Sequence, residues 1–147
     1  MKQNGLNVYT LNMNHEERDV QSALEDYIQK YDIGMVLTGG LSFQYNAIKE
    51  ILDYDSAIVT VAGGGIITSA PEAGMEVLEF ADYGIIGEGE ETTPALCRAV
   101  AEGSNPKSVN GLIIDPRTRC SPCTMVVPLS ISRKCPKRRW TGAQNRL

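Results

Sequence analysis

The chain has 147 residues, enough for one domain with a buried core, and 42% of them are hydrophobic. It contains no run approaching the roughly 20 apolar residues that cross a bilayer, and its start does not resemble a signal peptide, which predicts a cytoplasmic protein. Eight of the 14 basic residues lie in 117–147, which has no Asp or Glu, so residues 1–116 keep 14 − 8 = 6 basic against 18 acidic residues. This acidic body argues against nucleic-acid binding by its own surface.

The first half of the chain alternates between strand and helix patterns. Alternating apolar and polar residues predict a strand over Leu6–Asn12, and apolar residues at helical spacing predict an amphipathic helix over 19–30. A buried strand, Ile33–Thr38, follows and runs into two glycines. Ser42 is a candidate N-cap for the next helix. The expected apolar face of that helix comprises Phe43, Ala47, Ile48, Ile51 and Leu52.

The same alternation continues through the second half. Further strands are predicted over Ala57–Ala62, Asp82–Gly87 and Gly111–Asp115. One helix begins near Pro71, and another is capped by Thr92 or Thr93 and stops at Gly103. Near-continuous apolar strands that alternate with helices indicate a parallel sheet covered on both faces. The sequence therefore predicts an α/β domain over residues 1–115, a three-layer Rossmann-like (flavodoxin-like) parallel sheet with helices on both faces.

The end of the chain, residues 116–147, has a different character. It is basic and proline-containing, without a sustained period, which predicts a disordered or non-native tail. Cys120, Cys123 and Cys135 lack a fourth ligand at the spacing of a zinc site, so no metal ligands are assigned.

Three segments rich in glycine or hydroxyl residues each follow a predicted strand: 38–42, 63–69 and 87–93. Ligands of open parallel sheets bind beyond the carboxyl ends of the strands, so these segments are the candidate binding site. A glycine after a strand can also be a simple turn. The dinucleotide fingerprint and the P-loop motif are both absent. The only cluster of carboxylates in these segments comprises Glu88, Glu90 and Glu91, which could serve in acid–base catalysis or interact with a helix N-terminus. The single histidine, His15, fits a surface position. No catalytic residue is therefore assigned.

The runs DIGMVLTGGLS, IVTVAGGGIITSAPE and ADYGIIGEGEETTPAL resemble the cobalamin-binding domain of cobalamin-dependent radical S-adenosylmethionine enzymes, over about residues 5–114. The resemblance implies that the corrin ring lies across the carboxyl edge of the sheet, with its nucleotide tail beside the strands. The residues implied to bind cobalamin are Thr38, Gly39, Gly40, Leu41, Ser42, Gly63, Gly64, Gly65, Thr68, Ser69, Gly87, Glu88, Gly89 and Glu90.

Departures from the family pattern refine this expectation. The motif D-x-H-x-x-G is absent, so the resemblance implies no axial histidine from this chain. The family's first strand and helix have no counterpart before GLNVYTLN. In the family's strand order this predicts a sheet that keeps a gap, or fills it by swapping between copies in a homo-oligomer or by using the tail. The cluster motif C-x-x-x-C-x-x-C is also absent, so the iron–sulfur cluster and S-adenosylmethionine would belong to a separate catalytic partner domain.

The expected function is a cobalamin-binding module that presents its cofactor to that partner and does not turn over substrate alone. Two alternatives remain at this point. A domain of the same shape could bind another nucleotide-like ligand on the same loops. An interaction protein could instead contact nucleic acid through the basic tail, although the acidic body argues against a nucleic-acid partner.

Overall fold

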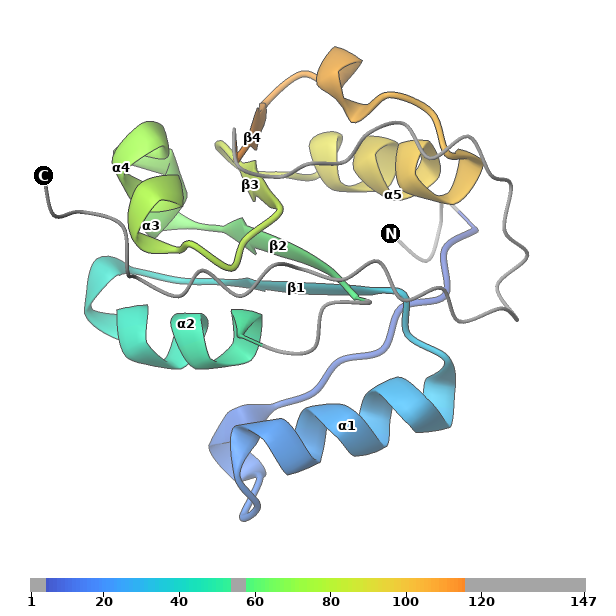
Figure 1. Ribbon diagram of the computed structural model, residues 1–147, viewed down its shortest axis with the longest axis vertical. Helices are drawn as coiled ribbons and strands as arrows, with labels where there is room; N and C mark the ends of the chain where they lie inside the picture. The colour runs from blue at the N-terminus through green and yellow to red at the C-terminus, as the bar shows by residue number, and fades with distance from the viewer. Residues whose placement is uncertain (1–4, 54–57, 116–147) are drawn as a thin grey trace, which may run out of the picture.

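The computed structural model describes residues 5–53 and 58–115 (Figure 1). The predicted tail, 116–147, lies outside the described residues. No helix in the described part is long and apolar enough to cross a membrane. The elements are, in order, η2 (Met13–His15), α1 (Val20–Tyr31), β1 (Met35–Gly39), η3 (Ser42–Gln44), α2 (Tyr45–Leu52), β2 (Val59–Gly63), α3 (Gly65–Thr68), α4 (Pro71–Val77), β3 (Tyr83–Ile85), α5 (Thr92–Glu102), η4 (Pro106–Ser108) and β4 (Leu112–Ile114).

The four strands form one sheet in the order β1-β2-β3-β4. The pairs β1–β2 and β2–β3 are parallel, as predicted, but β4 runs antiparallel to β3. The direction of β4 follows from the chain path: residues 103–111 return from the end of α5 to the carboxyl end of β3, where the Ile86 N–H donates to the Gly111 carbonyl at 2.8 Å. From there the chain can only run back along β3.

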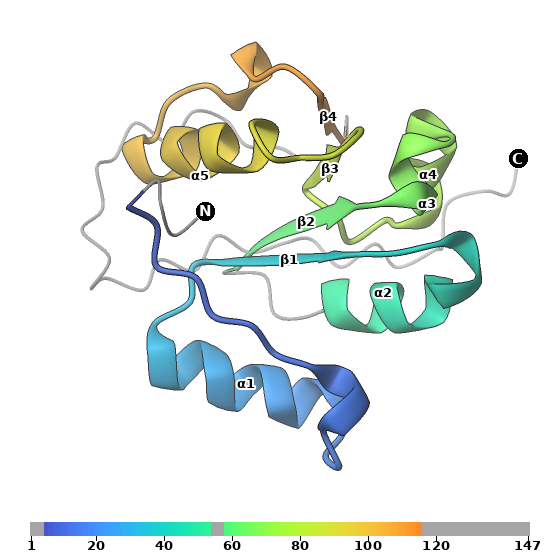
Figure 2. The same cartoon turned by 180° about the vertical axis from the view of Figure 1, so that it is seen from behind.

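Helices cover both faces of the sheet, which confirms the predicted layers (Figures 1 and 2). Ala62 of β2 belongs to the core cluster on the side of α2, α3 and α4, together with Ile48 and Leu78. Its neighbour Val61 points to the other face, where it packs with Leu96 of α5. This alternation along one strand shows why β2 reads as a continuous apolar run: both of its faces are buried.

The predicted strand Leu6–Asn12 is wrong. The segment is extended in both views but belongs to no sheet, because β1 is the edge of the described sheet and no strand lies between them (Figures 1 and 2). A strand needs a neighbour for its backbone groups, which alternating side chains cannot supply. The segment instead packs against α1, where the Tyr9 ring stacks on Tyr31 with centroids 4.1 Å apart.

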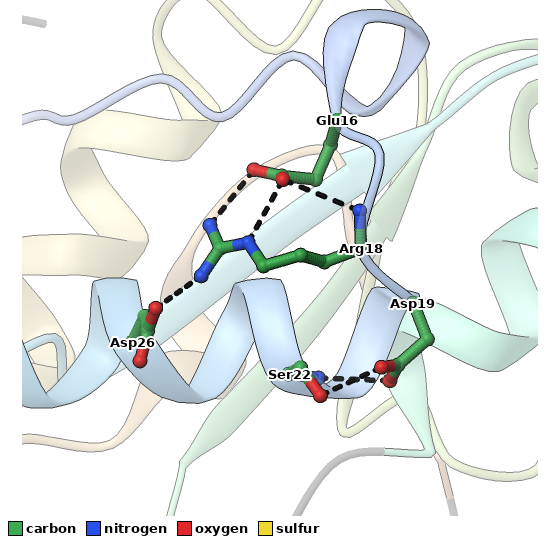
Figure 3. A network of polar contacts seen from close by, with 5 residues as sticks. All are labelled: Glu16, Arg18, Asp19, Ser22 and Asp26. Carbon is green, nitrogen blue, oxygen red and sulfur yellow. Dashed lines mark hydrogen bonds and ion pairs between the residues drawn. The ribbon is translucent and has the colours of Figure 1, made fainter.

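Helix α1 is secured at its start by local polar contacts (Figure 3). Asp19 is the N-cap, and its carboxylate accepts the Ser22 N–H at 3.0 Å. Arg18 donates to Glu16 at 2.9 Å and also to Asp26 within the helix. The hydrogen bond from Arg18 lowers the pKa of Glu16 from 4.5 to about 2.

The cap predictions for the other helices were only partly right. Gly103 ends α5 with a φ of +65°, as predicted. Ser42 caps no helix: it begins the turn η3, and α2 starts only at Tyr45. Neither Thr92 nor Thr93 is an N-cap, because both lie inside the first turn of α5.

The apolar face predicted for the second helix was also only partly right. Ile48 and Leu52 are buried, but Ala47 is exposed and Phe43 is 82% exposed. The cause is the break between η3 and α2, which ends the 3.6-residue period before it reaches Phe43.

Candidate functional site

The three loops singled out by the sequence meet at one edge of the molecule, which we call the carboxyl rim (residues 38–42, 63–69 and 87–93). They meet because β1, β2 and β3 are parallel and end on the same side. The Gly40 N–H donates to the Gly63 carbonyl at 3.3 Å, and the Gly40 carbonyl accepts the Ile66 N–H at 3.0 Å. The Gly87 N–H donates to the Thr68 hydroxyl at 3.0 Å. Backbone hydrogen bonds thus join neighbouring loops into one surface.

The glycines bring the first two loops into direct backbone contact. A Cβ on Gly39 would lie 2.5 Å from the Gly63 carbonyl oxygen, and one on Gly64 would lie 2.8 Å from the Gly40 nitrogen. Gly64 also has a φ of +78° and a ψ of −164°, a combination that is essentially confined to glycine. At these two positions the absent side chain is therefore required for folding, whatever the loops bind.

Three other rim glycines, Gly63, Gly65 and Gly87, are less constrained by the backbone of neighbouring loops. A Cβ on Gly63 would make only ordinary contact, 3.9 Å from Ile85. One on Gly65 would approach the end of the Leu41 side chain, which folds over this glycine. Gly87 has a φ of +82° but open space around it. Among the described residues, the N–H groups of Gly64 and Gly65 have no acceptor, so they remain available to a ligand.

The rim hydroxyls divide into engaged and available groups. Ser69 donates to the Gly65 carbonyl one turn earlier. Thr68 accepts the Gly87 N–H, which leaves its own proton to donate. The hydroxyl of the half-buried Thr38 has no partner within the described part of the chain, and Ser42 is exposed. Thr38, Ser42 and Thr68 are therefore the hydroxyls that a bound molecule could use.

The rim carries a negative edge and an apolar lip. Glu88, Glu90 and Glu91 are exposed and form no ion pair within the described ranges. Leu41, whose side chain lies against Gly65, is 54% exposed, and Phe43, which directly follows the first rim loop, is 82% exposed. The sequence prediction included Leu41 but missed Phe43, which it assigned to a buried helix face.

No arrangement for nucleophilic or metal chemistry is found in the described part of the chain. Burial raises the pKa of the Cys97 thiol, and its Sγ lies 3.7 Å from the Met35 sulfur, which favours an unreactive thiol. His15 is exposed in η2. No group of three potential metal ligands occurs among residues 5–53 and 58–115.

The rim suits a large ligand with many amide groups. Its free backbone N–H groups and hydroxyls can pair with amide and phosphate oxygens, and Leu41 and Phe43 offer apolar contact. The family model for the B12 binding domain matches residues 1–97, which include β1, β2, β3 and all three rim loops. No curated protein and no solved structure matches the chain. The chain belongs to the B12-binding domain family, and this membership supports cobalamin as its ligand.

Proposed function

We propose that the chain is the cobalamin-binding module of a radical S-adenosylmethionine enzyme and that the carboxyl rim holds the cofactor for a separate catalytic domain. The family match, which covers all three rim loops, carries the cobalamin part of this proposal. The radical S-adenosylmethionine partner rests on the resemblance of the runs that end β1, β2 and β3. Cobalamin would supply an alkyl-transferring cobalt centre to such a partner, and this chain would provide the binding site for the cofactor.

The available groups suggest a division of labour on the rim. Thr38 lies at the end of β1 and contributes a free hydroxyl, which suits the phosphate of the nucleotide tail. The nucleotide tail would need space free of side chains, which five rim glycines provide: Gly39, Gly40, Gly63, Gly64 and Gly65. The free N–H groups of Gly64 and Gly65 can donate to the ligand. Leu41, Ser42, Thr68, Ser69 and residues 87–90 would border the corrin ring.

The test is a titration of the full chain with hydroxocobalamin, followed by its visible spectrum and by retention through a desalting column. Wild-type protein should retain cobalamin at one equivalent. Thr38→Val removes the free hydroxyl at nearly constant volume and should weaken binding about fivefold, the equivalent of one hydrogen bond. Thr10→Val, on the exposed extended segment, is the matched control and should bind as wild type.

Two outcomes would contradict the proposal in different ways. A folded chain that retains no cobalamin refutes the cofactor. A chain that binds cobalamin equally well with Thr38→Val and with the control refutes the placement of Thr38 at the ligand. The partner is tested separately: addition of the cobalamin-loaded chain to a radical S-adenosylmethionine domain lacking its own cobalamin module should restore turnover.

A further inference from the structure

Gln44, which was not among the predicted binding residues, fastens the first rim loop. It is the last residue of η3 and directly precedes α2. Its backbone N–H donates to the Leu41 carbonyl at 2.9 Å, and its side-chain Oε1 accepts the Leu41 N–H at 3.0 Å. One residue therefore binds both backbone groups of Leu41 and closes the turn 41–44 at both ends.

The same side chain lies against Gly40. A Cβ on Gly40 would lie 3.1 Å from the Cδ of Gln44 and closer still to its Oε1. The absent side chain of Gly40 thus leaves the space that the Gln44 amide occupies. Gln44 therefore fixes two consecutive residues of the loop, Gly40 by contact and Leu41 by hydrogen bonds.

Gly40 in turn holds the second rim loop at two points. Its N–H donates to the Gly63 carbonyl at 3.3 Å, and its carbonyl accepts the Ile66 N–H at 3.0 Å. These two anchored residues flank Gly64 and Gly65, whose N–H groups have no acceptor among the described residues. The placement of the two free N–H groups therefore depends on where Gly40 lies.

We propose that Gln44 is a positioning residue of the carboxyl rim: it fixes Gly40 before the ligand arrives and thereby presents the free N–H groups of the second loop to the nucleotide tail of cobalamin. This inference rests on the proposed function, in which those N–H groups donate to the ligand. A loop that must be ordered during binding costs affinity, whereas a loop that is already fixed does not. Without the Gln44 amide, this ordering becomes part of the binding step.

The experiment compares two corrinoids that differ in the tail. Hydroxocobalamin carries the nucleotide and its phosphate, whereas aquacobinamide has the same corrin ring without them. Gln44→Met keeps the length of the side chain but removes the oxygen acceptor. This variant of the full chain should bind hydroxocobalamin about fivefold more weakly than wild type, the equivalent of one hydrogen bond, and should bind aquacobinamide as wild type does.

Gln29→Met is the matched control, because Gln29 is exposed on α1 and its amide donates to Glu25 one turn earlier. It should bind both corrinoids as wild type. The inference is overturned if Gln44→Met binds hydroxocobalamin as tightly as wild type. It is also overturned if this variant loses affinity for both corrinoids equally, because Gln44 would then support the whole domain. A folded wild type that binds neither corrinoid refutes the proposed function and this inference together, which separates the two failures.

Backbone hydrogen exchange keeps the test decisive if Gln44→Met fails to fold. In ligand-free wild type, the Leu41 amide should exchange more slowly than the amides of Gly64 and Gly65, and hydroxocobalamin should slow the exchange of these two. Gln44→Glu retains an oxygen acceptor and should keep the slow exchange of Leu41. A Leu41 amide that exchanges as fast as the Gly64 amide in ligand-free wild type overturns the inference, because the bond to Gln44 would then not hold the loop. Fast exchange of Leu41 in Gln44→Glu overturns it too, since the oxygen acceptor would not be what fixes Leu41.

Discussion

Replacement of the three consecutive glycines, one at a time, tests whether backbone contact between loops explains them. Gly64→Ala should be the damaging change. Its φ of +78° and ψ of −164° cost an alanine about 1–3 kcal/mol. The new Cβ, 2.8 Å from the Gly40 nitrogen, would also separate the loops and weaken the two hydrogen bonds of Gly40, at about 1 kcal/mol each.

The neighbouring glycines are internal controls for the same loop. Gly63→Ala makes an ordinary contact at 3.9 Å, so its free energy of unfolding should stay within about 0.5 kcal/mol of wild type. Gly65→Ala displaces only the end of the Leu41 side chain, and the better helix propensity of alanine offsets part of that cost. Urea denaturation followed by circular dichroism gives all three values.

Gly64→Ala should therefore lower the free energy of unfolding by about 3 kcal/mol, a large share of the typical 5–15 kcal/mol. The reasoning fails if Gly64→Ala is no more destabilising than Gly65→Ala. In that case the two loops are not packed backbone to backbone, and the glycines would be explained by the ligand alone.

Two further predictions concern the support of the fold. Because the pKa of Glu16 falls from 4.5 to about 2 in the folded state, its bond to Arg18 should stabilise the protein above about pH 4.5 and lose this effect as the pH falls towards 2. The urea midpoints of wild type and Glu16→Gln should therefore differ at pH 7 and converge near pH 2. A difference that stays constant with pH would contradict this. Thr60 is fully buried, and its hydroxyl contacts the Phe80 carbonyl and the Asp82 carboxylate. Thr60→Val should therefore lower the free energy of unfolding, measured in thermal melts, by about 1–2 kcal/mol. An unchanged value would show that these hydrogen bonds are dispensable.

Local patterns predicted most of the elements that position the rim. The strands β1, β2 and β3 were recognised as mainly apolar runs that lead into glycine-containing loops. For β2 and β3 the run is apolar because both faces of the strand are buried, whereas β1 is the partly exposed edge strand of the described sheet. The start of α4 at Pro71 and the end of α5 at Gly103 were also predicted, since fixed or left-handed φ values select these residues directly. The binding roles assigned to rim residues stay predictions until the titration is made.

Features that depend on a distant partner could not be read from local patterns. The segment Leu6–Asn12 alternates like a strand, but only the sheet determines whether a neighbouring strand exists to bond with it. The exposure of Phe43 depends on the break between η3 and α2, and the direction of β4 depends on the return path of residues 103–111.

The alternation of strands and helices and the three loops at one edge could be predicted from the chain alone, because side-chain period and glycine spacing are local properties. The reason for the glycines became visible in the packing of the loops against one another. Gly39 and Gly64 touch the backbone of a loop more than 20 residues away, and Leu37 lies exposed on the edge strand of the sheet that the described residues form. Both features depend on which segments distant in the chain lie against each other. A local sequence pattern shows what a residue itself prefers and not what packs against it.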